Sequence, residues 1–250
     1  MATAVRIQKI MADSGFCSRR AAEKLIDEGR VTVNGRPCSL GDKAIPGKDL
    51  LAVDGEKIPV EKKRSYVYLM LNKPKGVVSA TEDKEQTTVV DLVPDELMRK
   101  GLFPAGRLDK DTTGLLILTD DGDFAHEILS PKKHVQKVYL AKVNGSITDE
   151  IIEAFRTGVN VHNEYTTLPS KLSVVSREED GDWGKVILRE GMYHQIKRMF
   201  VSFGLKVVEL HRIRMGRLDL DESLEPGQCR PLTADEVQLL NTREEIAFED

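Results

Sequence analysis

The feature that most constrains the fold is residues 106–122, GRLDKDTTGLLILTDDG, where a charged turn leads into an apolar run. The run Leu115–Leu118 lies between turn signals, and short apolar runs in that setting form buried strands more often than helices. The pattern therefore predicts that Asp109 lies at the mouth of a sheet, held by a rigid strand. The same residues also fit an ordinary loop that contains an aspartate.

Length and composition are those of a globular protein. The chain has 250 residues, 40% of them hydrophobic and 31% charged, which suffices for one large or two smaller domains. No apolar run approaches the roughly 20 residues of a membrane helix, and the N-terminus lacks the apolar block of a signal peptide. The three cysteines are far apart, which argues against a disulfide framework. We therefore expect a cytoplasmic protein with no membrane partner.

The distribution of charge is more informative than the total of −4. Residues 1–64 carry a net charge of +4 and residues 185–217 carry +6, whereas residues 219–250 carry −8. Affinity for a polyanion depends on local basic surface and not on the net charge of the chain. The acidic segment 219–250 offsets the charge of two basic segments in the total, and those two segments are suited to nucleic acid. The alternative is that these lysines and arginines only solvate their faces.

The first 63 residues have the pattern of a small separate domain. Apolar spacing predicts a helix near Arg6–Ala12 and a second over Arg19–Glu28, with Ser18 as its N-cap. A strand then runs into the Asn34-Gly35 turn, which is a strong hairpin signal. The charged, aperiodic segment 61–65 predicts a domain boundary near residue 63.

The segment 7–35, IQKIMADSGFCSRRAAEKLIDEGRVTVNG, resembles the small RNA-binding domain named after ribosomal protein S4. The resemblance implies that residues 1–63 form an S4-like domain. It further implies that cations of the first helix and of the start of the second helix face RNA. These cations are Arg6, Lys9, Arg19, Arg20 and Lys24.

For residues 64–250, hydrophobic patterning predicts alternating strands and helices. The expected strands include Tyr66–Leu71, Val77–Ala80, Val138–Val143, Lys185–Leu188 and Val207–Gly216. The expected helices include Asp91–Lys100, Asp123–Leu129, Thr148–Arg156, a helix that ends at Phe200, and a last helix capped near Thr233.

Three separated segments of this second region resemble the RsuA-type pseudouridine synthases, named for the small-subunit ribosomal RNA enzyme. They are LNKPKGVVSA (71–80), GRLDKDTTGLLILT (106–119) and GMYHQIKRM (191–199), and KVYLAKV (137–143) resembles a fourth. The resemblance implies that Asp109 is the catalytic aspartate, that Tyr139 lies against the target base, and that Lys197 pairs with Asp109. Arg107 and Arg198 would then contact RNA. A second Gly-Arg-Leu-Asp, at 216–219, lacks the TTG and the apolar strand, so we reject Asp219 as the nucleophile.

The resemblance implies an α+β fold in which the small N-terminal α/β RNA-binding domain precedes a catalytic domain. That catalytic domain would have a mixed, largely antiparallel β-sheet with flanking helices. The implied reaction isomerises a specific uridine of ribosomal RNA to pseudouridine, with the base flipped out and Asp109 ionised. The preferred substrate is 16S small-subunit rRNA, free or in an assembling particle, and we expect a monomer.

Alternatives remain open at this stage. One is an enzyme for large-subunit 23S rRNA, and another is a non-catalytic factor for ribosome assembly. A methyltransferase is a third, although no glycine-rich cofactor loop follows a strand. The sequence has no metal-ligand motif, so we expect neither a cofactor nor a metal.

Overall fold

The computed structural model describes residues 3–58, 65–130, 135–162, 164–242 and 246–247. The chain divides into two compact units, Met1–Tyr66 and Val67–Asp250. The predicted boundary near residue 63 lies outside the described residues. Within the described ranges, no helix is long and apolar enough to cross a membrane.

The first unit packs two helices against a small antiparallel sheet. Its core is formed by one face of each helix and by the inner residues of the strands, among them Ile7, Met11, Ile26, Val31 and Leu51. The Ser18 hydroxyl accepts a hydrogen bond from the backbone of Ala21 at 3.2 Å and so begins the second helix. The elements are β1 (Val5–Arg6), α1 (Ile7–Asp13), α2 (Arg19–Asp27), β2 (Val31–Val33), β3 (Arg36–Pro37), β4 (Lys43–Ala44), β5 (Leu51–Val53) and β6 (Glu56–Lys57).

The second unit is built on one large sheet. Its strands are β7 (Tyr68–Lys73), β8 (Phe103–Ala105), β9 (Thr113–Thr119), β10 (Lys137–Val143), β13 (Lys171–Glu178), β14 (Gly181–Leu188), β15 (Val207–Met215), β16 (Leu218–Asp219) and β17 (Cys229–Pro231), with β11 (Asn160–Val161) and β12 (Tyr165–Thr166) as a separate pair. Its helices are α3 (Gly122–Leu129), α4 (Asp149–Thr157), α5 (Gln195–Val201) and α6 (Ala234–Leu240).

The main path of the sheet has the order β13-β14-β10-β15-β9-β7-β17. Neighbouring strands along it are antiparallel except β15 and β9, which are parallel. The sheet is therefore mixed and largely antiparallel, which confirms the α+β class expected from the sequence. The parallel contact in the middle brings the segment before β9 close to the last long strand, β15.

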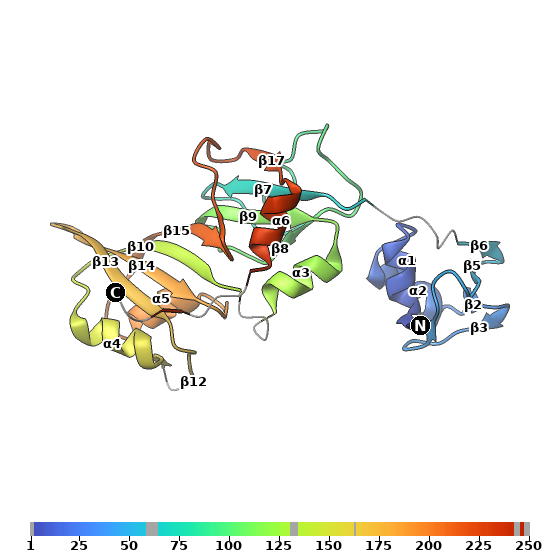
Figure 1. Cartoon of the computed structure of the whole chain (residues 1–250), viewed down its shortest axis with the longest axis horizontal. Coiled ribbons are helices and arrows are strands. Elements are labelled where there is room, and N and C mark those ends of the chain that lie inside the picture. The colour runs from blue at the N-terminus through green and yellow to red at the C-terminus, as the bar shows by residue number, and fades with distance from the viewer. Residues whose placement is uncertain (1–2, 59–64, 131–134, 163, 243–245, 248–250) are drawn as a thin grey trace. The chain divides into compact units, whose positions relative to one another are not determined.

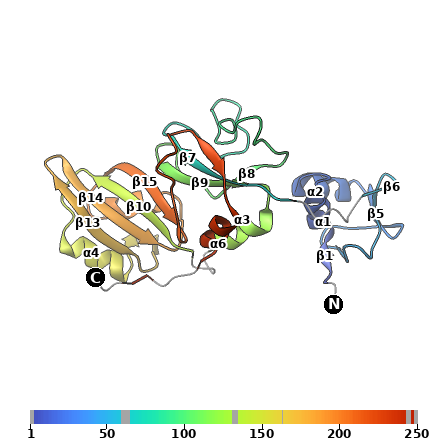
Figure 2. The same ribbon diagram turned by 45° about the horizontal axis from the view of Figure 1, so that its top comes forward.

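Strand β9 is buried on both faces, which explains why its sequence is a continuous apolar run and not an alternating one. Leu116 and Leu118 join the core beneath α4 and α5, whereas Leu115 and Ile117 join the core beneath α3 and α6. Figures 1 and 2 show α3 and α6 together near β8, and α4 beside β13 and β14.

Two expected elements are absent. Residues 91–100 form successive turns instead of a helix, and Leu97 N–H and Met98 N–H both donate to the Pro94 carbonyl. Residues 77–80 form only an isolated bridge between Val78 and Thr88 instead of a strand. This loop supports the charged turn: the Ser79 hydroxyl donates to the Leu108 carbonyl at 2.8 Å and accepts from its N–H at 3.0 Å.

Candidate active site

Asp109 lies in the turn between β8 and β9, and its backbone is held from several sides. Leu108 is buried in the core on the α4–α5 face and is fixed by Ser79. The Asp109 carbonyl accepts a hydrogen bond from Thr112 N–H at 3.0 Å. The Lys110 carbonyl accepts one from Gly76 N–H at 2.7 Å. The carboxylate itself remains about a quarter exposed and faces a small cavity.

Lys73 holds this turn in place through hydrogen bonds. Its side chain is fully buried, and its ammonium group donates to the carbonyls of Thr112 at 2.9 Å, Pro74 at 3.0 Å and Lys110 at 3.4 Å. Burial lowers the pKa of Lys73 to about 8, although the negative charges of Asp111 and Asp109 oppose that shift. Lys73 therefore acts as an internal brace for the loop that carries Asp109.

Lys197 pairs directly with Asp109. Helix α5 buries Ile196, Met199 and Phe200 in the core, which leaves the Lys197 side chain directed at the turn. Its ammonium lies 2.9 Å from Asp109 Oδ2 and 2.5 Å from Asp111 Oδ1. Partial burial alone would lower the pKa of Lys197, but hydrogen bonds to Asp111 and Asp109 raise it, so the cation persists.

Arg198 makes a different set of contacts. Its guanidinium pairs with Glu164 at 2.5 Å and lies 5.3 Å from the centroid of the Tyr165 ring. Successive helix residues point about 100° apart, so neighbouring cations of α5 reach different acidic partners. Lys197, and not Arg198, contacts Asp109 in this structure.

Sequence reasoning missed His194. It precedes α5 in a left-handed backbone conformation with φ of +49°, which is uncommon for a residue other than glycine. Its Nε2 lies 3.4 Å from Asp109 Oδ1, and its ring stacks on Tyr193 at a centroid distance of 3.8 Å. Its position three residues before Lys197 was the available signal, because residues three apart share one side of a turn or helix.

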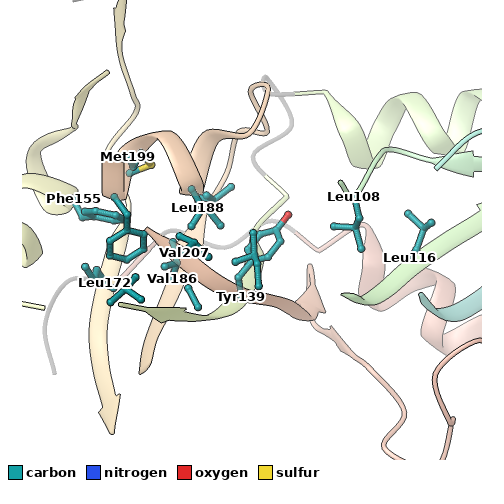
Figure 3. Close-up of a cluster of buried hydrophobic side chains, with 14 of the residues drawn as sticks. Leu108, Leu116, Tyr139, Phe155, Leu172, Val186, Leu188, Met199 and Val207 are labelled. Carbon is teal, nitrogen blue, oxygen red and sulfur yellow. The ribbon is translucent and has the colours of Figure 1, made fainter. Parts of the chain in front are cut away.

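Tyr139 lines the same cavity as Asp109. The cavity has a volume of about 70 Å³, and its walls include Arg107, Thr112, Tyr139, Leu188 and His194. Tyr139 is only 8% exposed, and Figure 3 shows its ring among buried apolar side chains, beside Val186 and Leu188. Thr112 Oγ1 is buried and has no hydrogen-bond partner among the described residues. The cavity therefore combines a carboxylate, a phenol and an unsatisfied hydroxyl.

The remaining residues expected to bind RNA are mostly exposed. Arg107 is exposed at the cavity. In the first unit, Arg6, Arg19, Arg20 and Lys24 are exposed, while Lys9 is half-buried. Lys9 and Lys24 also pair along their helices, with Asp13 at 3.0 Å and Glu28 at 3.8 Å.

The rejected aspartate, Asp219, lies on β16 and pairs with Arg214 at 2.5 Å. In the part of the chain that the structure describes, no group of three or more His, Cys, Asp or Glu side chains is placed to hold a metal ion.

Comparisons with known proteins found a matching family for each of the two units. Residues 67–202 match the family described as RNA pseudouridylate synthase, and residues 5–49 match the S4 domain. An uncharacterized RNA pseudouridine synthase of Bacillus subtilis is 44% identical over 95% of this chain and 98% of its own length. The ribosomal small subunit pseudouridine synthase A of Escherichia coli is 41% identical over 93% of this chain and 98% of its own.

Among solved structures, a pseudouridylate synthase crystal structure with 36% sequence identity superposes with a TM-score of 0.68. It covers 94% of this chain and 99% of that one. The match extends through both units and includes the segments that carry Asp109, Tyr139 and Lys197. The chain therefore belongs to the RNA pseudouridine synthases of the RsuA type.

Proposed function

We propose that this enzyme converts a specific uridine of 16S small-subunit ribosomal RNA to pseudouridine, with Asp109 as the nucleophile. The observation that carries the proposal is the Lys197–Asp109 ion pair at a cavity that Tyr139 also lines. The Lys197 ammonium, at 2.9 Å, places positive charge beside the carboxylate that would act as the nucleophile. The 16S assignment is supported by the names of relatives about 40% identical, which are ribosomal small subunit enzymes.

The reaction breaks the N-glycosidic bond of the uridine, turns the uracil and rejoins it to the ribose through C5. Asp109 would form a transient covalent bond to the nucleotide, which breaks again before the product leaves, and Tyr139 would hold the turned base and accept the proton from C5. The Thr112 hydroxyl, which has no hydrogen-bond partner among the described residues, is available to a polar atom of the bound nucleotide. No outside reactant is needed.

The uridine must leave its stack in RNA, which costs roughly a few kcal/mol in base-flipping enzymes. The flipped base would enter the cavity of about 70 Å³, whose lining includes Met192, which is 51% exposed. Arg107, exposed at the same cavity, would contact the RNA that delivers the base.

RNA recognition would be shared between the units. Within the proposed RNA-binding domain, residues 1–63, the exposed cations Arg6, Arg19, Arg20 and Lys24, with Lys9, would contact phosphates. Arg198 would add a contact near the cavity in the second proposed domain, residues 64–250. We also propose that the enzyme is a monomer, and that it acts in the cytoplasm because its proposed substrate is ribosomal RNA.

The substrate is tested by tritium release from RNA labelled at uracil C5. Unmodified small-subunit and large-subunit rRNA transcripts are assayed separately, without added cofactor. Release from the small-subunit transcript alone is expected. Release from the large-subunit transcript alone would overturn the 16S assignment. Binding without release, on free rRNA and on assembling particles, would favour a non-catalytic assembly factor.

The nucleophile is tested by Asp109→Asn, which keeps the size of the side chain but removes its charge. Turnover should fall at least about 10³-fold, while RNA affinity stays near that of the wild type. Asp219→Asn is the matched control, because Asp219 ends the second Gly-Arg-Leu-Asp and lies outside the cavity. Normal product formation by Asp109→Asn would show that the nucleophile lies elsewhere.

A further inference from the structure

Arg212 is a buried cation that the proposed mechanism has not used. It lies on β15 and is only 2% exposed. Its Nε donates a hydrogen bond to the Leu115 carbonyl at 2.7 Å, and its Nη1 lies 3.5 Å from the Tyr139 hydroxyl. Its Nη2 is buried without a hydrogen-bond partner, and no carboxylate pairs with Arg212 among the described residues.

Such an arrangement is unfavourable for stability alone. An uncompensated buried charge costs several kcal/mol, and an apolar side chain of similar size would avoid that cost. A second buried cation, Lys137, lies on the strand of Tyr139, and its pKa is lowered to about 8 by burial and by the charge of Arg212. Two basic side chains are therefore buried near each other in this part of the sheet, and one of them, Arg212, reaches the phenolic oxygen of Tyr139.

The backbone fixes this contact. Arg212 and Tyr139 are direct partners across β15 and β10, so their side chains leave the same face of the sheet. On its other side, Arg212 pairs with Gly114 of β9, where an added Cβ would lie 2.3 Å from the Arg212 carbonyl oxygen. Arg212 thus links the strand that follows Asp109 to the strand that carries Tyr139.

We propose that Arg212 is a positioning residue for Tyr139, whose hydroxyl it orients and whose negative charge it stabilises when the phenol is ionised. This inference rests on the proposed role of Tyr139 as the proton acceptor. The charged and titratable groups in this region are Arg212 from β15, whose Nη1 contacts the phenol, Lys137 from β10, whose ammonium interacts with Arg212, and the cavity-lining Arg107, Asp109 and His194, with Lys197 paired to Asp109. The Arg212 guanidinium, at 3.5 Å, is the cation placed to stabilise negative charge on the phenolic oxygen.

Protons and electrons are conserved in the proton transfer. After C5 of the turned uracil has bonded to the ribose, the phenolate takes the proton from C5. The C5–H bonding pair forms the C5=C6 double bond, the N1=C6 double bond opens onto N1, and N1 takes a proton. The phenol returns its proton to solvent before the next turnover, so the isomerisation consumes no proton. Arg212 stays protonated throughout and stabilises the charge on the phenolic oxygen.

Two substitutions separate charge from structure. Arg212→Gln keeps a donor for the Leu115 carbonyl but is neutral, whereas Arg212→Lys keeps the cation. The probe is the single-turnover rate of tritium release as a function of pH, with excess enzyme and the rRNA transcript that the wild type modifies. Arg214→Met, on the exposed part of the same strand, is the control and should keep the wild-type profile.

We expect Arg212→Gln to lower the rate at neutral pH on the order of 10²-fold and to move the rising limb of the profile to higher pH. Arg212→Lys should recover much of the rate and keep the limb near its wild-type position. Equal rates for the two variants, or a loss that is the same at every pH, would overturn the proposal.

Tyr139→Phe separates this inference from the proposed function. If Tyr139→Phe is inactive and Arg212→Gln is normal, the role of Arg212 is refuted while that of Tyr139 stands. If Tyr139→Phe releases tritium normally, Tyr139 is not the proton acceptor and both roles are refuted. If Arg212→Gln adds no further loss to the residual rate of Tyr139→Phe, Arg212 acts through Tyr139 as proposed.

Discussion

At the scale of single residues, one cation of the site, Lys197, pairs with two carboxylates. Lys197 contacts both Asp109 and Asp111, and Asp111 is the more exposed of the two. Desolvation opposes ionisation of Asp111, but its hydrogen bond from Lys197 lowers the pKa of that carboxyl. Asp111 therefore holds Lys197 in reach of Asp109 while remaining at the edge of the cavity.

Replacement of Lys197 tests this arrangement. In Lys197→Met, Asp109 loses its cation, and we expect turnover to fall on the order of 10²-fold while RNA affinity changes little. Arg198→Met is the matched control, because Arg198 pairs with Glu164 instead, and its effect should appear in RNA affinity only. Comparable single-turnover rates for Lys197→Met and the wild type would contradict the assigned role of Lys197.

How well single residues can be predicted depends on whether their neighbours are near in sequence. The resemblance to known motifs pointed to Asp109, Tyr139 and Lys197, which the structure places around one cavity or in contact with it. Arg212 and Lys73 were not among the site residues predicted from the sequence, because a lysine or arginine in a strand is normally solvated. Only the folded sheet shows that both are buried, Lys73 against the turn that carries Asp109 and Arg212 against strand β9.

At the scale of elements, the close approach of β9 and β15 holds the site together. Gly114 has φ of +98°, and an added Cβ would lie 2.3 Å from the backbone oxygen of Arg212. Glycine adopts this conformation without strain, and its missing side chain allows the two parallel strands to meet. The strand that follows Asp109 and the strand that carries Arg212 are thereby kept in register.

We predict that Gly114→Ala lowers the free energy of unfolding by more than about 1 kcal/mol, because both the backbone conformation and the strand contact oppose a methyl group. Gly122→Ala is the control: Gly122 begins α3, its φ is not positive, and no atom lies within 4 Å of an added Cβ. Urea denaturation should show a lower midpoint for Gly114→Ala only. Equal midpoints would mean that β15 can move away without cost.

Elements were predictable where local pattern and tertiary environment agree. The apolar run of β9 and the N-caps Ser18, Thr148 and Thr233 were readable from sequence, and each cap accepts the expected backbone hydrogen bond. Residues 91–100 were not, because they form separate turns on either side of Pro94, which cannot donate a backbone hydrogen bond. Apolar periodicity does not show such a break in the backbone hydrogen bonds.

At the scale of the whole molecule, net charge is a poor guide to where charge acts. Part of the negative charge of segment 219–250 is neutralised by ion pairs within the fold, because Arg230 pairs with Asp221 and Glu236, each at 2.6 Å. Cations of the first unit also pair within the fold, Lys9 with Asp13, Lys24 with Glu28 and Arg30 with Asp54. Sequence counts located the basic segments but not the pairs that neutralise the acidic one.

Stability of the second unit should respond to pH through Lys73. The folded pKa of Lys73 is about 8, below the value of 10.5 for an unperturbed lysine. Between pH 8 and 10.5 the unfolded chain therefore holds a proton that the folded chain has released, so stability rises with pH across this window. Below the folded pKa both states are protonated, and this contribution no longer changes with pH.

Lys73→Met removes this titration. The free energy of unfolding of the wild type, minus that of Lys73→Met, should therefore grow from pH 8 to pH 10.5, with a slope of at most about 1.4 kcal/mol per pH unit. Urea denaturation followed by the fluorescence of Trp183, which lies on β14, reports on the second unit. Lys75→Met, at an exposed neighbour, should show no such growth. A difference that stays constant across the window would mean that Lys73 is charged to the same extent in the folded and unfolded chains, and that the turn carrying Asp109 is braced without cost to the ammonium.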